Sequence, residues 1–222
     1  MRMAFEVLDE HEQGELVRKW LRTNAMSILI GIAIGLLLIF GYQQWKARDL
    51  RTQSEAASQF AAFSDAVEAK RDADANRIAE ALRKDYAKSA FASFSALRQA
   101  EVSVGKADLK AASDDLEWAS QSTSNTALKS LIALRQARLS LADGKADAAL
   151  AKLDQIAKTE FTASASELRG DALAKLGRAA DARAAYAEAL SQLDPQSPDR
   201  AFVEMKQGDL PAADKAPEQK KS

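Results

Sequence analysis

The side chains best suited to acid–base or metal chemistry lie in two acidic clusters. His11 is the only histidine of the chain and stands among carboxylates in DEHEQGE, residues 9–15, a set that could bind a metal ion weakly. Asp114, Asp115 and Glu117 form the second cluster and could act as a general acid and base. Nothing around His11 predicts a pocket, and carboxylates spaced like the second set usually form the solvated face of a helix. We therefore expect no metal, no cofactor and no catalytic site.

Composition argues against several other functions. Cysteine is absent, which removes thiol catalysis, disulfides and cysteine metal sites. The glycines are isolated, so the sequence has no glycine-rich phosphate loop. The 31 Lys and Arg residues are balanced by 32 Asp and Glu residues without a basic half, whereas nucleic-acid binding needs a concentrated positive surface. We expect a protein that is not an enzyme, with no nucleic-acid partner and no small-molecule substrate.

Three arginines recur at matched places and are candidates for a binding surface. Arg98, Arg135 and Arg169 each follow a leucine in a repeated phrase, 37 and 34 residues apart. They could line a protein-binding surface together with Arg138 and Asp171, which lie close by in the same phrases. Ion pairs between neighbouring repeats would explain the three arginines as well, so both interpretations stay open.

The phrase around these arginines occurs three times. ALRQAEVSVGKAD, residues 96–108, returns as ALRQARLSLADGKAD, residues 133–147, and more loosely as ELRGDALAKLGRAAD, residues 167–181. Self-similarity at such a period indicates a repeat array, in which stacked units bury apolar faces that no single unit could bury alone.

Each copy predicts a helix, a turn and a second helix. In the second copy the apolar residues have helical spacing on both sides of the turn; they are Leu131, Leu134, Ala137 and Leu141, then Leu150, Leu153 and Ile156. We expect Gly105, Gly144 and Gly177 to end the first helices in the left-handed conformation, which glycine adopts without steric cost. The second copy has two extra residues before its glycine, Ala142 and Asp143, which we expect to lengthen that turn.

The repeats fill most of the chain after residue 45. Residues 54–86 predict a more degenerate first hairpin without a turn glycine, and residues 201–206 predict a short capping helix. The last segment, residues 208–222, is polar and contains prolines, and we expect it to be disordered. Abundant alanine favours helices. The prediction is an all-α fold, in which residues 46–207 form an α-solenoid of about three to four helical hairpins.

An uncharged segment precedes the repeats. Between Arg22 and Lys46 the chain has no charged residue, and the centre of this gap reads AMSILIGIAIGLLLIFGY, residues 25–42. A helix of this length spans about 27 Å, close to the hydrocarbon thickness of a bilayer, about 30 Å. A cleaved signal peptide would have a shorter apolar stretch and a small-residue cleavage site, and a buried core helix would carry a polar face. We expect an uncleaved, single N-terminal transmembrane helix over residues 25–45.

The orientation of this helix does not follow from charge. Three cations stand just before it, within a short N-terminal arm of residues 1–24, and three stand just after it. The positive-inside rule therefore gives no answer. Gly31 and Gly35 form a G-x-x-x-G spacing that could let a second membrane helix approach closely, although glycine is common in membrane helices in any case.

The last copy resembles the tetratricopeptide repeat. That family places small, turn and aromatic residues at set positions along two helices, and this chain matches them in order with Gly170, Gly177, Ala182, Tyr186 and Ala189. The preceding copy keeps the small residues but lacks the aromatic one. The resemblance implies that the α-solenoid is tetratricopeptide-like.

The whole layout resembles the YfgM-like ancillary SecYEG translocon subunits of Gram-negative bacteria. A short acidic arm, one membrane helix ending near YQQW, residues 42–45, and a C-terminal repeat domain follow in the same order, with the most specific stretches at residues 125–156 and 167–190. The resemblance implies an inner-membrane protein with its N-terminus in the cytoplasm and its repeats in the periplasm. It also implies association with SecYEG and with periplasmic chaperones or folding factors, and it carries no catalytic motif.

Two functions of different kinds are compatible with these features. The favoured one is a non-enzymatic, membrane-anchored adaptor on the periplasmic side of the secretion channel. The alternative is a scaffold whose repeats face the cytoplasm and serve another inner-membrane complex, which the tied charge count permits. An enzyme is disfavoured, because the lone histidine is separated from the repeats by the membrane helix.

Overall fold

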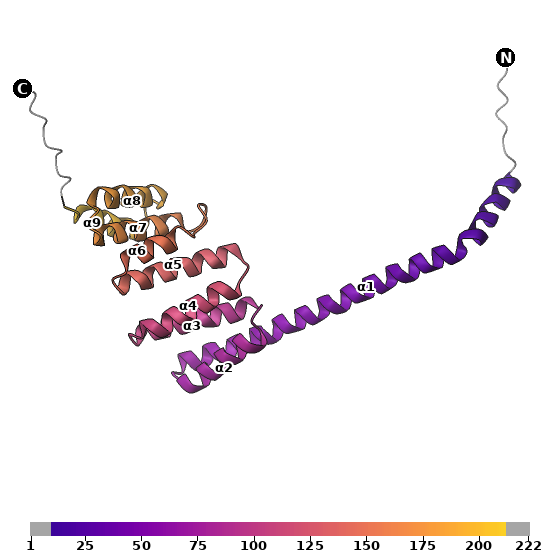
Figure 1. Ribbon diagram of the computed structural model, residues 1–222, viewed down its shortest axis with the longest axis horizontal. Helices are drawn as coiled ribbons and strands as arrows, with labels where there is room; N and C mark the ends of the chain where they lie inside the picture. The colour runs from indigo at the N-terminus through magenta and orange to yellow at the C-terminus, as the bar shows by residue number, and fades with distance from the viewer. Residues whose placement is uncertain (1–9, 212–222) are drawn as a thin grey trace, which may run out of the picture. The chain divides into compact units, whose positions relative to one another are not determined.

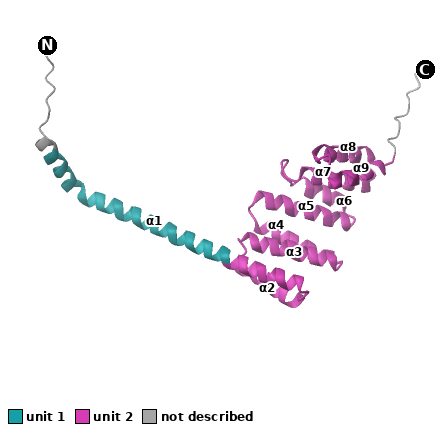
Figure 2. Cartoon of the chain, turned by 180° about the vertical axis from the view of Figure 1, so that it is seen from behind, with its two compact units in different colours: residues 1–54 teal, residues 55–222 magenta. Residues whose placement is uncertain are grey.

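The computed structural model describes the backbone of residues 10–211 and the side chains from residue 14 onward. Within that range all nine elements are α-helices, without a strand among them (Figure 1). The predicted all-α fold is therefore confirmed. The chain divides into two compact units, Met1–Ser54 and Glu55–Ser222 (Figure 2).

The first unit is built on α1, a helix that runs from Glu10 to Glu68 and continues into the second unit. Among the described residues, α1 is the one helix that is long and apolar enough to cross a membrane, and none of its most apolar window is buried. Leu37 and Leu38, for example, are 71% and 70% exposed. The core helix of a folded domain would bury such side chains, so that alternative is wrong for this segment.

Up to residue 211, the second unit consists of four helical hairpins and a capping helix, stacked in chain order (Figure 1). The end of α1 pairs with α2 (Asp72–Asp85), and the following pairs are α3 (Ala90–Gly105) with α4 (Leu109–Ser122), α5 (Thr126–Ala142) with α6 (Ala146–Leu153), and α7 (Thr162–Lys175) with α8 (Ala179–Gln192). The last helix, α9, is Pro198–Gly208. Four hairpins agree with the predicted solenoid.

Each first helix after α1 buries apolar residues on more than one side, which is why the hairpins stack. In α5, Leu128 and Ile132 lie in a cluster with residues of α3 and α4, whereas Leu134 and Leu141 lie in a second cluster with residues of α6 and α7. A hairpin alone would leave one of these faces in water. The predicted first hairpin is also confirmed, since its stripes meet in a third cluster that contains the fully buried Phe63.

The four hairpins turn in the same way. In each turn one residue takes the left-handed conformation, namely Lys70 (φ 54°), Ala107 (φ 60°), Gly144 (φ 74°) and Gly177 (φ 72°), at spacings of 37, 37 and 33 residues. The N–H of this residue donates to the carbonyl three residues earlier, and the next N–H donates to the carbonyl five residues earlier. This is the Schellman motif, which satisfies carbonyl groups that a helix end leaves without partners.

The prediction for Gly144 and Gly177 is confirmed, but the one for Gly105 is wrong. Gly105 is the last residue of α3, and the left-handed residue of that turn is Ala107. The N–H of Ala107 donates to the Val104 carbonyl at 2.9 Å. An alanine therefore stands where the later turns have glycine.

The predicted longer turn in the second copy is also wrong. Three residues separate α3 from α4, and three residues separate α5 from α6. The helices repeat at 37 residues, which puts Gly105 opposite Ala142 and Ala107 opposite Gly144. The shared letters GKAD suggested an insertion because they stand two residues out of register with the helices that carry them.

The array ends in a capping helix that is longer than predicted. In α9, Pro198 occupies the first turn, where its missing N–H costs nothing, and the Ser197 hydroxyl accepts a hydrogen bond from the Asp199 N–H at 3.3 Å. Val203 is fully buried against α7 and α8. The predicted disordered tail, residues 208–222, lies mainly outside the described residues; its first residue ends α9.

Candidate protein-binding groove

The acidic residues considered for catalysis each have their own partners. The Asp114 carboxylate pairs with Lys110 at 2.8 Å, and Asp115 pairs with Arg83 of α2. Burial raises the pKa of Asp115, and Arg83 opposes that rise. Glu117 accepts hydrogen bonds from two glutamine side chains. Asp115 and Glu117 thus contact neighbouring helices, at Arg83 of α2 and Gln136 of α5, whereas Asp114 pairs within α4.

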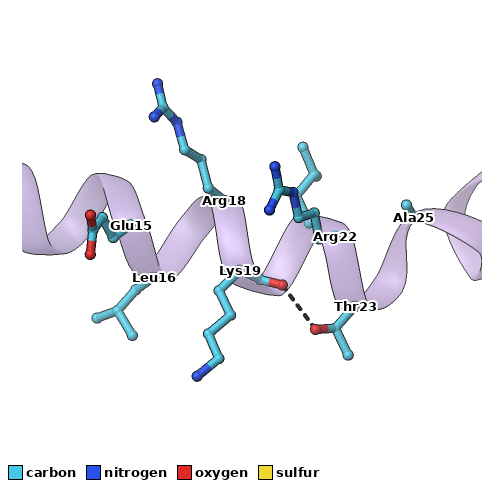
Figure 3. Close-up of a pocket in the computed structure, with 8 residues that line it drawn as sticks. Glu15, Leu16, Arg18, Lys19, Arg22, Thr23 and Ala25 are labelled. Carbon is cyan, nitrogen blue, oxygen red and sulfur yellow. Dashed lines mark hydrogen bonds between the residues drawn. The ribbon is translucent and has the colours of Figure 1, made fainter.

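The sequence raised the possibility of a metal site around His11 in the N-terminal arm. The side chain of His11 lies outside the described residues. From residue 14 to residue 211, no group of three or more potential metal-ligating side chains comes together. A shallow hollow does follow the N-terminal part of α1, from Glu15 to Ala25 (Figure 3). All its lining residues belong to that single helix, and among them the Thr23 hydroxyl donates a side-chain hydrogen bond to the Lys19 carbonyl at 2.9 Å. It is the open surface of a helix.

The three matched arginines make three different contacts. Arg98 forms an ion pair within α3 at 2.8 Å. Arg135 donates from Nη1 to the Leu97 carbonyl of α3 at 3.3 Å. Arg169 pairs at 2.7 Å with Asp154, which follows α6. Two of the three therefore reach the preceding hairpin, but only Arg169 does so through an ion pair of the kind that the structural interpretation expects.

A groove opens between α3 and α5. α5 packs on α7 more closely than on α3, and the space left between α3 and α5 is about 360 Å³. Its lining is mostly apolar and comes from three helices; the residues are Leu97, Ala100, Glu101, Val104, Leu116, Arg135, Arg138, Leu139 and Ala142. An apolar groove with a few polar groups at its edge is the usual form of a binding site.

The groove brings together part of the predicted site. Arg135 and Arg138 line it, and Arg98 lies beside it because its ion-pair partner, Glu101, is a lining residue. Arg169 and Asp171 are not among the lining residues. Arg169 pairs with Asp154, and Asp171 pairs with Lys206.

Asp171 belongs to the C-terminal cap. Its carboxylate accepts a hydrogen bond from the Tyr186 hydroxyl at 2.7 Å and pairs with Lys206 of α9 at 2.8 Å. Lys206 also pairs with Glu167 at 2.7 Å. These contacts give Asp171 a role in fastening α9 to α7 and α8, and its part in partner binding stays a prediction.

Sequence reasoning missed the apolar half of the groove. Val104 is 46% exposed on α3, and Leu139 of α5 lines the opposite side. The repeated phrase showed both residues, but it could not show that α3 and α5 stand apart. One signal of the charge at the groove was available in the sequence. At a spacing of 37 residues Arg138 is equivalent to Glu101, so the two helices carry opposite charges at the same position of the repeat.

The glycine pair in the membrane segment stays a prediction as well. A Cβ atom placed at Gly31 or at Gly35 would meet no other atom within 4 Å. The space beside both glycines is therefore open, and another membrane helix could approach there.

Comparison with known proteins gives the family. The chain is 29% identical over 180 residues to a protein of Escherichia coli strain K12, covering 80% of this chain and 85% of the relative. It is 26% identical over 197 residues to a protein of Haemophilus influenzae, covering 87% and 96%, and 27% identical over 207 residues to one of Neisseria gonorrhoeae, covering 92% and 98%. All three are named ancillary SecYEG translocon subunit, which confirms the expected resemblance.

No solved structure matches the chain significantly. The sequence does match the tetratricopeptide repeat-like domain family over residues 18–212, nearly the whole of the described range. This protein therefore belongs to the tetratricopeptide repeat-like domain family.

Proposed function

We propose that this protein is a membrane-anchored adaptor, without catalytic activity, that associates with the SecYEG translocon. The observation that carries the proposal is the match to proteins named ancillary SecYEG translocon subunit, which covers 80% to 92% of this chain in the three relatives above. The helical repeats and their groove support it, because stacked hairpins provide extended surfaces for binding other proteins.

The anchor would act by raising local concentration. α1 carries the apolar segment, and exposed aromatic side chains stand near both ends of it, at Trp20, Tyr42 and Trp45. Such rings favour the interface between lipid and water. A protein surface confined to the plane of the inner membrane meets a partner in that membrane at a higher effective concentration than a free domain would.

We further propose that the repeats lie in the periplasm and the N-terminal arm in the cytoplasm. On this side of the membrane the groove could receive periplasmic chaperones or folding factors. Support comes from the resemblance alone, since the cations flanking the apolar segment are three on each side.

Co-purification tests the association. The full chain, tagged at its C-terminus, would be extracted from membranes in mild detergent, with another single-span protein of the same membrane and similar abundance as control bait. We expect the SecYEG subunits to be enriched with this protein over the control. Equal recovery of SecYEG with both baits would refute the association.

Reporter fusions after Ser222 test the orientation. Alkaline phosphatase, which becomes active only in the periplasm, should be active when fused at this position. A fluorescent protein that folds only in the cytoplasm should be dark when fused at the same position. The opposite pattern would place the repeats in the cytoplasm and support a scaffold of another inner-membrane complex. Photo-crosslinking from position 138 would then identify the proteins that reach the groove in either compartment.

A further inference from the structure

α3 and α5 line the groove from two sides, and equivalent positions of the two helices are 37 residues apart. These positions include Phe94 and Leu131, Arg98 and Arg135, and Glu101 and Arg138; in the last pair both residues line the groove. Two of the three pairs keep the chemical type. At the third position a carboxylate on α3 is replaced by a guanidinium on α5.

This replacement leaves positive charge at the groove without compensation. On α3, Arg98 and Glu101 neutralise each other at 2.8 Å. On α5, Arg135 and Arg138 are one turn apart, and like charges at that spacing repel each other. Arg135 engages the Leu97 carbonyl through Nη1, and the side chain of Arg138 has no hydrogen bond or ion pair with any residue from 14 to 211.

The same arrangement does not recur in α7. Continuing by 33 residues, the spacing between the ends of α5 and α7, the positions of Arg135 and Arg138 become Leu168 and Asp171. The arginine of α7, Arg169, is paired with Asp154 at 2.7 Å. In the described array, two neighbouring arginines facing an apolar groove are therefore found between α3 and α5.

The apolar wall lies beside the two arginines. Val104 is 46% exposed at the mouth, whereas Leu97 and Leu116 are 4% and 2% exposed and form deeper parts of the lining. A volume of about 360 Å³ is within the range of pockets that hold small ligands or side chains, roughly 300–1,000 Å³. An occupant that complements the groove must be apolar on one side and negatively charged on the other.

We propose that this groove binds a polypeptide segment in which an aliphatic side chain stands next to an aspartate or glutamate. The carboxylate pairs with Arg138 and with the remaining N–H groups of Arg135, because guanidinium groups bind carboxylates through two parallel hydrogen bonds. The aliphatic side chain enters between Val104 and Leu139. The inference rests on the proposed function in one respect, that the partner is a protein.

Three labelled peptides test this chemistry. They are eight residues long and identical except for a central pair, which is Leu-Asp, Leu-Asn or Ser-Asp. Their affinities for the full chain in lipid nanodiscs would be measured by fluorescence polarisation. We expect the Leu-Asp peptide to bind at least about fivefold more tightly than either of the others, because each of those lacks one of the two contacts.

Two charge reversals on α5 locate the site. Arg138→Glu should lower the affinity for the Leu-Asp peptide by about fivefold or more and abolish the preference for Asp over Asn. Lys129→Glu makes the same change in charge on the same helix. Lys129 lies nine residues before Arg138, which places it on the opposite side of the helix. Its reversal should therefore leave the affinities for the Leu-Asp and Leu-Asn peptides unchanged.

Several results would overturn the inference. Equal binding of the Leu-Asp and Leu-Asn peptides, no binding of any peptide, or equal losses in the two variants would each exclude a carboxylate contact at Arg138. The outcome is separate from the fate of the proposed function. If SecYEG fails to co-purify while the preference for the Leu-Asp peptide persists, the adaptor proposal is refuted and the proposed binding chemistry of the groove is supported. If SecYEG co-purifies but the Leu-Asp peptide is not preferred, only the binding chemistry is refuted.

Discussion

Tyr186 fills the space that a side chain at position 170 would need. A Cβ atom built on Gly170 would overlap the Tyr186 ring, so α7 and α8 approach each other through a glycine on one helix and an aromatic ring on the other. The ring is 3% exposed, and its hydroxyl donates to Asp171. The fit between these two residues sets the geometry of the last hairpin.

Replacing this glycine should therefore weaken the last hairpin. We expect Gly170→Ala to lower the free energy of unfolding by about 1–3 kcal/mol, because the added methyl group forces the Tyr186 ring or the α7 backbone to move. Urea unfolding, monitored by circular dichroism, would measure this loss of stability. Gly105→Ala is the matched control, since a Cβ atom there meets nothing within 4 Å, and we expect it to be neutral or slightly stabilising. Equal losses in both variants would contradict the close fit.

The hydroxyl of Tyr186 predicts a loss of stability at alkaline pH. Burial, the hydrogen bond to Asp171 and the negative charge of Asp171 raise the pKa of Tyr186 well above its ordinary value of 10.0. Above that ordinary value the unfolded chain releases the proton while the folded chain keeps it, so stability falls as the pH rises. Tyr186→Phe should cost about 1 kcal/mol at pH 8 and show a shallower decline above pH 10. Parallel stability curves between about pH 8 and pH 11 would show that Tyr186 does not carry this dependence.

At the scale of the residue, the sequence marked Gly170 and Tyr186 but gave no sign of the left-handed Ala107. Gly170 and Tyr186 match repeat-family positions in a clear pattern, and the structure joins them. Ala107 carries no such mark, because alanine is a helix former that rarely takes a positive φ. Its conformation follows from the helices on either side, which outweigh the local cost.

At the scale of whole elements, the equivalence of the turns after α3 and α5 can be tested. Ala107 and Gly144 hold equivalent places in the second and third turns, with φ of 60° and 74°. A residue with a Cβ atom pays roughly 1 kcal/mol or more for that conformation. We expect Ala107→Gly to raise the free energy of unfolding by up to about 1 kcal/mol, and Gly144→Ala to lower it by about the same amount. Opposite signs in urea unfolding are the expected result; a loss in both variants would show that the turns are not equivalent.

The helices themselves were largely predictable, and their spacing in space was not. Apolar residues at helical intervals predicted α5 and α6 and one buried face of α5, but not its second buried face around Leu128 and Ile132. The prediction also carried the second helix on to Ile156, whereas α6 ends at Leu153. The groove depends on the distance between α3 and α5, which arises from packing over several hairpins. The sequence of one repeat does not determine that distance. Arg135 and Arg138 could therefore be proposed as candidate binding residues, but their position at a common groove could not be predicted.

For the whole molecule, the apolar part of α1 decides where the protein resides. Ile34 and Leu37 are 53% and 71% exposed and lie near the centre of the uncharged run. Each change to arginine raises the cost of insertion by about 3 kcal/mol or more. We expect the double variant Ile34→Arg, Leu37→Arg to be lost from the membrane pellet after alkaline carbonate extraction. Leu50→Arg, at a residue that is 61% exposed but outside the uncharged run, should stay in the pellet; retention of the double variant would refute the span.

The equal spacing of the turns also bears on how such a chain can change in length. α3 and α5 end 37 residues apart and lead into turns of the same form, and the two phrases that encode them are nearly the same. Unequal recombination between them would remove or add a whole hairpin while leaving an acceptable turn at the junction. Loss of residues 106–142, for instance, would join Gly105 to Asp143 and delete α4 and α5 together. The shortened solenoid would still be able to stack, but it would have lost both arginines that face α3.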